Sequence, residues 1–222
     1  MAKYEQGSTK SKLLHAGAKL FLSIGYEKAT IVKISDTAGV SRGSFGFFFK
    51  DKDLLLCELV DLVLECQFNE INRLFADKTT DKVLLYAAET ILQLHMAESS
   101  EHMREMYNVS YSLASSSSII YRAITGKLEE VFKPYNAEWQ TRDFYEREIS
   151  AAGIMRNHMS VPCDMYFTME RKIRAFIEST FKVFNVPMDK INEAIEFVLK
   201  FDWKTIAQGV IDGMRMYLES NI

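Results

Sequence analysis

The chain has 222 residues, of which 48% are hydrophobic and 26% are charged, and its formal net charge is −3. This composition is ordinary for a soluble globular protein, and no run approaches the roughly 18 uninterrupted apolar residues that a membrane span needs. The start, MAKYEQGSTK, lacks the apolar stretch of a secretion signal, so we expect a cytoplasmic protein with no membrane partner. The odd number of cysteines, without zinc-like spacing, argues against a disulfide framework or a structural metal; we expect no cofactor and read the three as small core residues, Cys57, Cys66 and Cys163.

Charge is unevenly distributed along the chain. Residues 1 to 52 hold nine basic and four acidic side chains, a net charge of +5, whereas the remaining residues carry −8. A local excess of Lys and Arg attracts phosphates and releases their counterions. The charge pattern therefore indicates a polyanion as partner at the N-terminal end.

The first 52 residues predict three short helices. A stripe of apolar residues runs from residue 11 to residue 24, and Gly25 supplies the stop. Thr30 has the position of an N-cap for a second helix that ends at Gly39. Ser41 caps a third helix, whose Phe45 and Phe49 lie one turn apart on its buried side. Three short helices with a tight glycine turn between the second and third match a helix-turn-helix.

The rest of the chain also has helical spacing. Only three prolines and ten glycines interrupt the sequence, and the run from Ser115 to Ser118 is expected to be a loop. We predict an all-α protein with a helix-turn-helix domain at residues 1–52 and a larger helical domain at 53–222. Beyond the helix that starts at Asp53, the predicted helices are 81–97, 100–113, 118–133, 137–159, 165–185 and 189–219.

Residues 12 to 56, KLLHAGAKLFLSIGYEKATIVKISDTAGVSRGSFGFFFKDKDLLL, resemble the DNA-binding module of TetR/AcrR-type transcription regulators. The matching features are the Gly25-Tyr26 pair, Thr30, the segment from Ala38 to Ser41, Gly43-Ser44-Phe45, and Phe49-Lys50 with Lys52. The resemblance implies a homodimer, usually a repressor, that binds a palindromic operator in double-stranded DNA and releases it when a small molecule enters the larger domain.

Within that module, position suggests which residues would contact DNA. Arg42 is the best candidate for a base contact, because its planar fork can donate two hydrogen bonds to guanine. Thr30, Lys33 and Lys52 are expected to hold phosphates, and the role of Lys52 follows from the resemblance. The full set of expected DNA-binding residues is Thr30, Lys33, Ser41, Arg42, Gly43, Ser44, Gly46, Phe47, Phe48 and Lys52.

The module departs from the family pattern at two positions. Gly46 stands where the family has a tyrosine that touches the DNA backbone, and Phe48 where it often has histidine or tyrosine. A helical wheel directs Phe47 toward the groove, where it could pack on a thymine methyl or a sugar, while Gly46 would let the backbone approach phosphate closely. The alternative is a module that has lost its affinity for DNA.

The larger domain is rich in aromatic residues and methionine. Such side chains are usually core, but they also suit a small-molecule cavity in a helical bundle. The expected ligand-binding residues are Phe68, Tyr107, Tyr111, Trp139, Tyr145 and Arg156. For Arg156 an ion pair with Glu148 is the alternative. By the resemblance, the last two predicted helices form the dimer interface, where Gly209 and Gly213 would allow close approach.

Two groups of titratable residues have helical spacing. Glu58, Asp61 and Glu65 are expected to form a solvated stripe rather than an acid–base site. His95, Glu98 and His102 share a helix face that could in principle bind metal, but no third histidine or cysteine is near in sequence. No phosphate loop or dinucleotide fingerprint occurs. We therefore expect a ligand-responsive DNA-binding regulator, not an enzyme, with a dimeric small-molecule-binding or scaffold protein as the alternative.

Overall fold

The computed structural model describes residues 7–220, and side chains up to residue 216. Within this range the chain is helical, with one short 3-10 turn and no strand, which confirms the all-α prediction. No helix in this part of the chain is both long enough and apolar enough to cross a bilayer. The helices are α1 (Thr9–Ile24), α2 (Ile31–Ala38), α3 (Arg42–Phe48), α4 (Lys52–Phe75), α5 (Lys82–Glu98), α6 (Glu101–Ser112), α7 (Ala114–Phe132), α8 (Thr141–Ser160), α9 (Met169–Val183), α10 (Met188–Val198) and α11 (Trp203–Ser220), with the 3-10 turn at Lys133–Tyr135.

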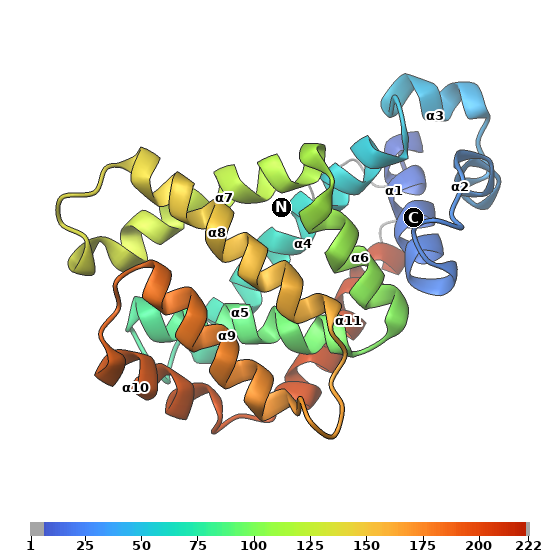
Figure 1. Ribbon diagram of the computed structural model, residues 1–222. Helices are drawn as coiled ribbons and strands as arrows, with labels where there is room; N and C mark the ends of the chain where they lie inside the picture. The colour runs from blue at the N-terminus through green and yellow to red at the C-terminus, as the bar shows by residue number, and fades with distance from the viewer. Residues whose placement is uncertain (1–6, 221–222) are drawn as a thin grey trace.

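Helices α1, α2 and α3 form a small head, which lies at one end of the molecule (Figure 1). Each begins with a hydroxyl cap, because the side chains of Ser8, Thr30 and Ser41 accept a backbone N–H from the first turn. Gly39 ends α2 with φ of 65°, a left-handed conformation that favours glycine. The three helices therefore lie at the residues that the sequence predicted for them.

The long helix α4 leaves the head and enters the larger body, where α5 forms the centre (Figure 1). Helix α5 packs against α4 and against each helix from α6 to α11, and nearly all of its side chains are buried. Burial on every side explains its apolar sequence, since a helix that is hydrophobic all round must lie inside a core.

The predicted helix over 189–219 is wrong, because the chain breaks between α10 and α11. At the break the Trp203 indole donates to the Val198 carbonyl at 2.6 Å and its ring stacks on Phe75 at 5.6 Å. The Asp202 carboxylate then accepts the Thr205 N–H at 3.2 Å, which is the cap of a new helix. The spacing of apolar residues predicted one continuous helix, but an aromatic cluster and a capping aspartate divide it into two.

The predicted loop at Ser115 to Ser118 is also wrong, because these serines form the first turn of α7. Ser117 and Ser118 donate their hydroxyls to carbonyls three residues back, and Ser116 donates to the Ser110 carbonyl at 2.7 Å. Bonded in this way, the hydroxyls of Ser116 and Ser117 are buried with their donors satisfied.

Candidate nucleic-acid interface and adjoining cavity

Helix α3 is fixed to the head by one face and open on the other. Phe45 and Phe49 are each 1% exposed, and their rings lie 5.7 Å apart, centroid to centroid. Phe47, by contrast, is 82% exposed and Phe48 37% exposed, with the two rings edge to face at 5.0 Å. The helical wheel predicted this outward direction for Phe47, while its contact with DNA stays a prediction.

The N-terminal end of α3 carries the polar part of this surface. Ser41 accepts the Ser44 N–H at 3.0 Å, and the two hydroxyl oxygens lie 2.9 Å apart. Arg42 and Gly43 follow the cap and are exposed, as is Gly46 one turn later. A Cβ added at Gly46 would meet nothing within 4 Å, so the surface is open there.

The candidate phosphate-binding residues lie in two different environments. Thr30 and Lys33 are exposed at the start of α2, where the Thr30 hydroxyl accepts the Lys33 N–H at 3.3 Å. Lys52 is half-buried instead: its ammonium donates to the Tyr26 carbonyl at 2.8 Å and lies 3.9 Å from the centre of the Tyr26 ring. Lys52 thus also ties α4 to the loop that follows α1.

Tyr26 and Asp53 complete this tie at the base of the head. The Tyr26 hydroxyl donates to the Asp53 carboxylate. Burial, together with that bond, raises the pKa of Tyr26 above its ordinary value. The start of α4 is therefore held to the head by a neutral phenol and a cation at once.

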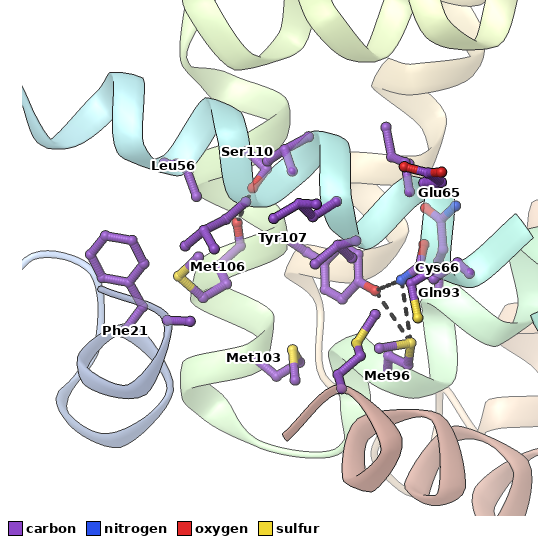
Figure 2. Close-up of a pocket in the computed structure, with 18 of the residues that line it drawn as sticks. Phe21, Leu56, Glu65, Cys66, Gln93, Met96, Met103, Met106, Tyr107 and Ser110 are labelled. Carbon is purple, nitrogen blue, oxygen red and sulfur yellow. Dashed lines mark hydrogen bonds between the residues drawn. The ribbon is translucent and has the colours of Figure 1, made fainter. Parts of the chain in front are cut away.

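A cavity of about 360 Å³ lies between the head and the body. Figure 2 shows Phe21 on the side of the head, Tyr107 near the middle, and Gln93 and Met96 beyond it. The lining is mainly aliphatic and sulfur-containing, which suits an adaptable apolar site. Its members include Phe21 and Leu22 of α1, Leu59, Val63, Glu65, Cys66, Gln67 and Glu70 of α4, Gln93 and Met96 of α5, Met103, Met106, Tyr107, Ser110 and Tyr111 of α6, Ile120 of α7 and Met214 of α11.

Two hydrogen-bonded pairs of uncharged side chains lie inside this cavity. Gln67 donates its amide to the Tyr107 hydroxyl, and burial raises the pKa of that phenol above its ordinary value. Tyr111 donates to Gln93 Oε1 at 3.0 Å. No Lys, Arg or His is among the described residues that line the cavity, and its two carboxyl groups belong to Glu65 and Glu70. The site therefore offers nothing to neutralise an anion.

A second, smaller cavity of about 20 Å³ adjoins the first, since Gln93 and Tyr111 line both. Its notable group is Glu148 of α8, which is 4% exposed. Burial raises the pKa of this carboxyl to about 8. Arg156 is exposed, and no ion pair joins it to Glu148 among the described side chains, so the predicted salt bridge is not formed.

The structure separates the six predicted ligand-binding residues. Tyr107 and Tyr111 line the larger cavity, and Phe68 and Tyr111 line the smaller one. The other three line neither: Trp139 packs on Phe144, Tyr145 contacts Tyr121 at the surface, and Arg156 is exposed. We leave these three out of the site, because aromatic content alone did not say which helix face is turned inward.

Several lining residues were missed at the sequence level. Met103, Met106 and Ser110 recur with the predicted Tyr107 at spacings of three and four on α6, a pattern that could have identified one cavity-facing stripe. Gln67 and Glu148 carried no such signal, because a single polar residue in an amphipathic helix is usually on its solvated face.

The group His95, Glu98 and His102 is not assembled around a common point. Glu98 accepts from the Lys172 ammonium at 2.8 Å and from Arg104 at 3.0 Å, while His102 Nδ1 lies 3.1 Å from the Leu22 carbonyl oxygen. Burial lowers the pKa of His95 to about 4. Within residues 7–220 no group of three or more His, Cys, Asp or Glu could hold a metal ion.

The acidic residues of α4 and the three cysteines, which the sequence analysis also named, have the following environments. Glu58 pairs with Lys10 at 2.5 Å, and Glu65 is exposed at the larger cavity. All three cysteines are free thiols; Cys57 is buried and the other two are half-buried.

Helix α6 connects the larger cavity with the head. Glu105 accepts the Glu27 N–H at 3.1 Å, and His102 contacts the Leu22 carbonyl. Met103 and Met106, which alternate with these residues along α6, line the cavity. Helix α6 therefore contacts both the cavity and the end of α1.

Comparison with known proteins gave a family match for the head and solved structures of similar fold. Residues 13–59 match the model of the family described as bacterial regulatory proteins, tetR family. A search of curated proteins gave no match.

Among solved structures, RolR in complex with resorcinol has a TM-score of 0.65 at 14% identity, covering 86% of this chain and 92% of that one. Thermus thermophilus FadR in complex with lauroyl-CoA has a TM-score of 0.58 at 16% identity, covering 79% and 92%. SmeT, the repressor of a Stenotrophomonas maltophilia multidrug efflux pump, has a TM-score of 0.55 at 18% identity, covering 79% and 90%. At these identities the likeness shows the shared fold.

Proposed function

We propose that this protein, whose residues 13–59 match the tetR family of bacterial regulatory proteins, is a ligand-responsive transcription regulator that binds double-stranded DNA. The observation that carries the proposal is α3, which buries Phe45 and presents Arg42 and Phe47 to solvent behind a serine cap. A helix fixed by one face and open on the other can enter the major groove.

In this proposal the residues divide by role. Arg42 reads a base edge, while Thr30, Lys33 and Lys52 hold phosphates and so set the register of the head on the duplex. Lys52 uses its ammonium both for the Tyr26 carbonyl and for phosphate, since an ammonium has three N–H donors.

The larger cavity is the proposed effector site, and α6 is the proposed connection. A ligand that displaces Met103 or Met106 shifts α6, and the contacts of Glu105 and His102 carry that shift to the end of α1. Release of DNA requires that the effector and the DNA prefer different positions of the head, because a ligand indifferent to the two would change nothing.

We also propose a homodimer, which presents two heads to a palindromic operator and represses by covering a promoter. The apolar residues that suggested an interface on the last helices, such as Ile177 and Val198, are buried within the chain itself. Exposed apolar side chains remain on the last helices at Met188 of α10 and Met216 of α11, but more of them lie on α8 and the loop after it: Tyr145, Ile149, Val161, Met165 and Tyr166. We place the interface on this surface.

A mobility-shift assay tests the function. It uses the DNA upstream of the gene that encodes this protein, at two salt concentrations. Site-specific retention that weakens with salt is expected, because phosphate contacts release counterions. A dimer that shows no retention at low salt would favour the alternative, a dimeric small-molecule-binding or scaffold protein whose head no longer grips DNA.

A further inference from the structure

The two cavities carry carboxyl groups and no basic lining residue. In the larger cavity these are Glu65 and Glu70, and in the smaller they are Glu89 and Glu148. Glu70 pairs with Arg73 at 2.7 Å, Glu89 pairs with Lys127, and Glu65 is exposed to solvent. Three of the four carboxylates are thus neutralised or hydrated.

Glu148 is the exception. It is 4% exposed, and its carboxyl makes neither an ion pair nor a hydrogen bond among the side chains that the structure describes. A buried carboxyl group without a partner costs stability in either protonation state, more so when ionised. The environment of Glu148 is therefore incomplete without a donor.

The surroundings of Glu148 suit a small cation. Tyr86, Tyr111 and Phe176 line the same cavity, and the faces of aromatic rings attract positive charge. The Phe68 ring, which also lines it, already carries the Lys127 ammonium at 3.8 Å from its centre. The volume of about 20 Å³ holds roughly one water-sized group, which is the size of a primary ammonium. A bulky cationic centre would not fit.

The larger cavity gives access to this point. Gln93 and Tyr111 line both cavities, and the Tyr111 hydroxyl donates to Gln93 Oε1 at 3.0 Å. A molecule whose apolar body lies among the methionines of the larger cavity would reach Glu148 with its end group by passing between these two side chains.

We propose that the effector is a lipophilic primary amine, whose apolar body fills the larger cavity and whose ammonium group pairs with Glu148. The inference rests on the proposed function, in which the larger cavity takes an effector. Because burial raises the pKa of Glu148 to about 8, the empty site holds a largely neutral acid near pH 7, and the arriving ammonium returns the proton to solvent by stabilising the carboxylate.

Probes of one chain length and different end groups test the inference. Titration calorimetry would compare octylammonium, 1-octanol, octanoate and octyltrimethylammonium. Octylammonium is expected to bind about tenfold or more tightly than octanol, since a charged hydrogen bond in a buried site is worth a factor of that order. Octanoate is expected to bind more weakly than octanol, and the trimethylated probe more weakly than octylammonium.

Two variants locate the charge. Glu148→Gln is expected to reduce octylammonium binding to the level of octanol and to leave octanol unchanged. Glu146→Gln removes an exposed carboxylate from the same helix, so its binding profile should equal that of the wild type. The probe series on the wild-type chain needs no variant and decides the matter even if Glu148→Gln fails to fold.

Equal binding of octylammonium and octanol, failure of all the probes to bind, or an unchanged ammonium preference in Glu148→Gln would each overturn the inference. DNA retention is measured separately on the same protein. Retention without any ammonium preference contradicts the inference alone, whereas ammonium preference without retention contradicts the regulatory function alone.

Discussion

Arg42 and Lys33 share a charge but differ in what they are expected to recognise. Arg42 follows the cap of α3, where a guanidinium can meet a base edge, while Lys33 lies in the first turn of α2. Arg42→Ala should lower the preference for one base pair by about 1–3 kcal/mol. Lys33→Ala should weaken all sequences alike and reduce the salt dependence. Dissociation constants over a set of single-base operator variants check this, and equal effects of the two substitutions would contradict the assigned roles.

Phe47 offers a different kind of recognition at the same helix. Because it is 82% exposed, Phe47→Ala should leave the free energy of unfolding nearly unchanged. If its ring packs on a thymine methyl, replacing that thymine by uracil should weaken binding of the wild type but not of Phe47→Ala. The check is a cycle of two proteins and two DNA duplexes in a mobility-shift assay. A uracil effect of the same size in both proteins would place the ring elsewhere.

At the scale of the element, Gly46 sets a balance between the stability of α3 and its access to DNA. A Cβ there meets nothing within 4 Å, so Gly46→Ala should stabilise the folded chain by up to about 1 kcal/mol. If the missing side chain lets the backbone approach phosphate, the same substitution should weaken DNA binding. Urea unfolding and mobility-shift titration measure the two effects. A variant that is more stable and binds DNA as well as the wild type would contradict the idea that Gly46 lets the backbone approach phosphate.

The elements of the head could be predicted because local signals agree there. Ser41, Gly39 and Thr30 act through hydrogen bonds and dihedral angles within a few residues, which a sequence displays directly. The break between α10 and α11 could not be predicted from periodicity, because it depends on Trp203 stacking on Phe75, a residue far away in the chain. The bounds of a helix could therefore be predicted where nearby residues determine them, and not where a distant contact does.

The candidate site follows the same rule. The outward direction of Phe47 follows from a helical wheel, which needs only the sequence of α3. Membership of the cavity depends on which faces of α4, α5 and α6 meet, and this excluded Trp139 and Tyr145 although their residue types fit. Glu148 could not be singled out, since its burial results from packing of α8 on several other helices.

At the scale of the whole molecule, the dimer proposal makes a prediction on α8. Ile149 is 46% exposed, so Ile149→Lys should leave the fold of one chain intact while placing a charge in the proposed interface. Sedimentation should show a shift from dimer to monomer at micromolar concentration. Ser150→Lys, at the neighbouring exposed position on α8, is the control for added charge. If Ile149→Lys remains a dimer, the interface does not lie on this surface of α8.

The pH dependence of unfolding reports on Glu148 in the intact molecule. In the folded chain burial raises the pKa of this carboxyl to about 8, whereas its ordinary value is 4.5. Between these two values the folded state holds a proton that the unfolded state has lost, so this group lowers the free energy of unfolding as pH rises from about 4.5 to 8. His95 acts in the opposite sense, because burial lowers its pKa from 6.5 to about 4 and its contribution rises with pH over that range.

A comparison of the wild type with Glu148→Gln isolates the carboxyl, because His95 and every other group contribute to both proteins. The amide cannot ionise, so the stability of Glu148→Gln relative to the wild type should increase by several kcal/mol between pH 5 and pH 9. Urea unfolding at matched ionic strength measures this difference. A difference that stays constant with pH would mean that the Glu148 carboxyl ionises as easily inside the protein as in water, and that its cavity is open to solvent.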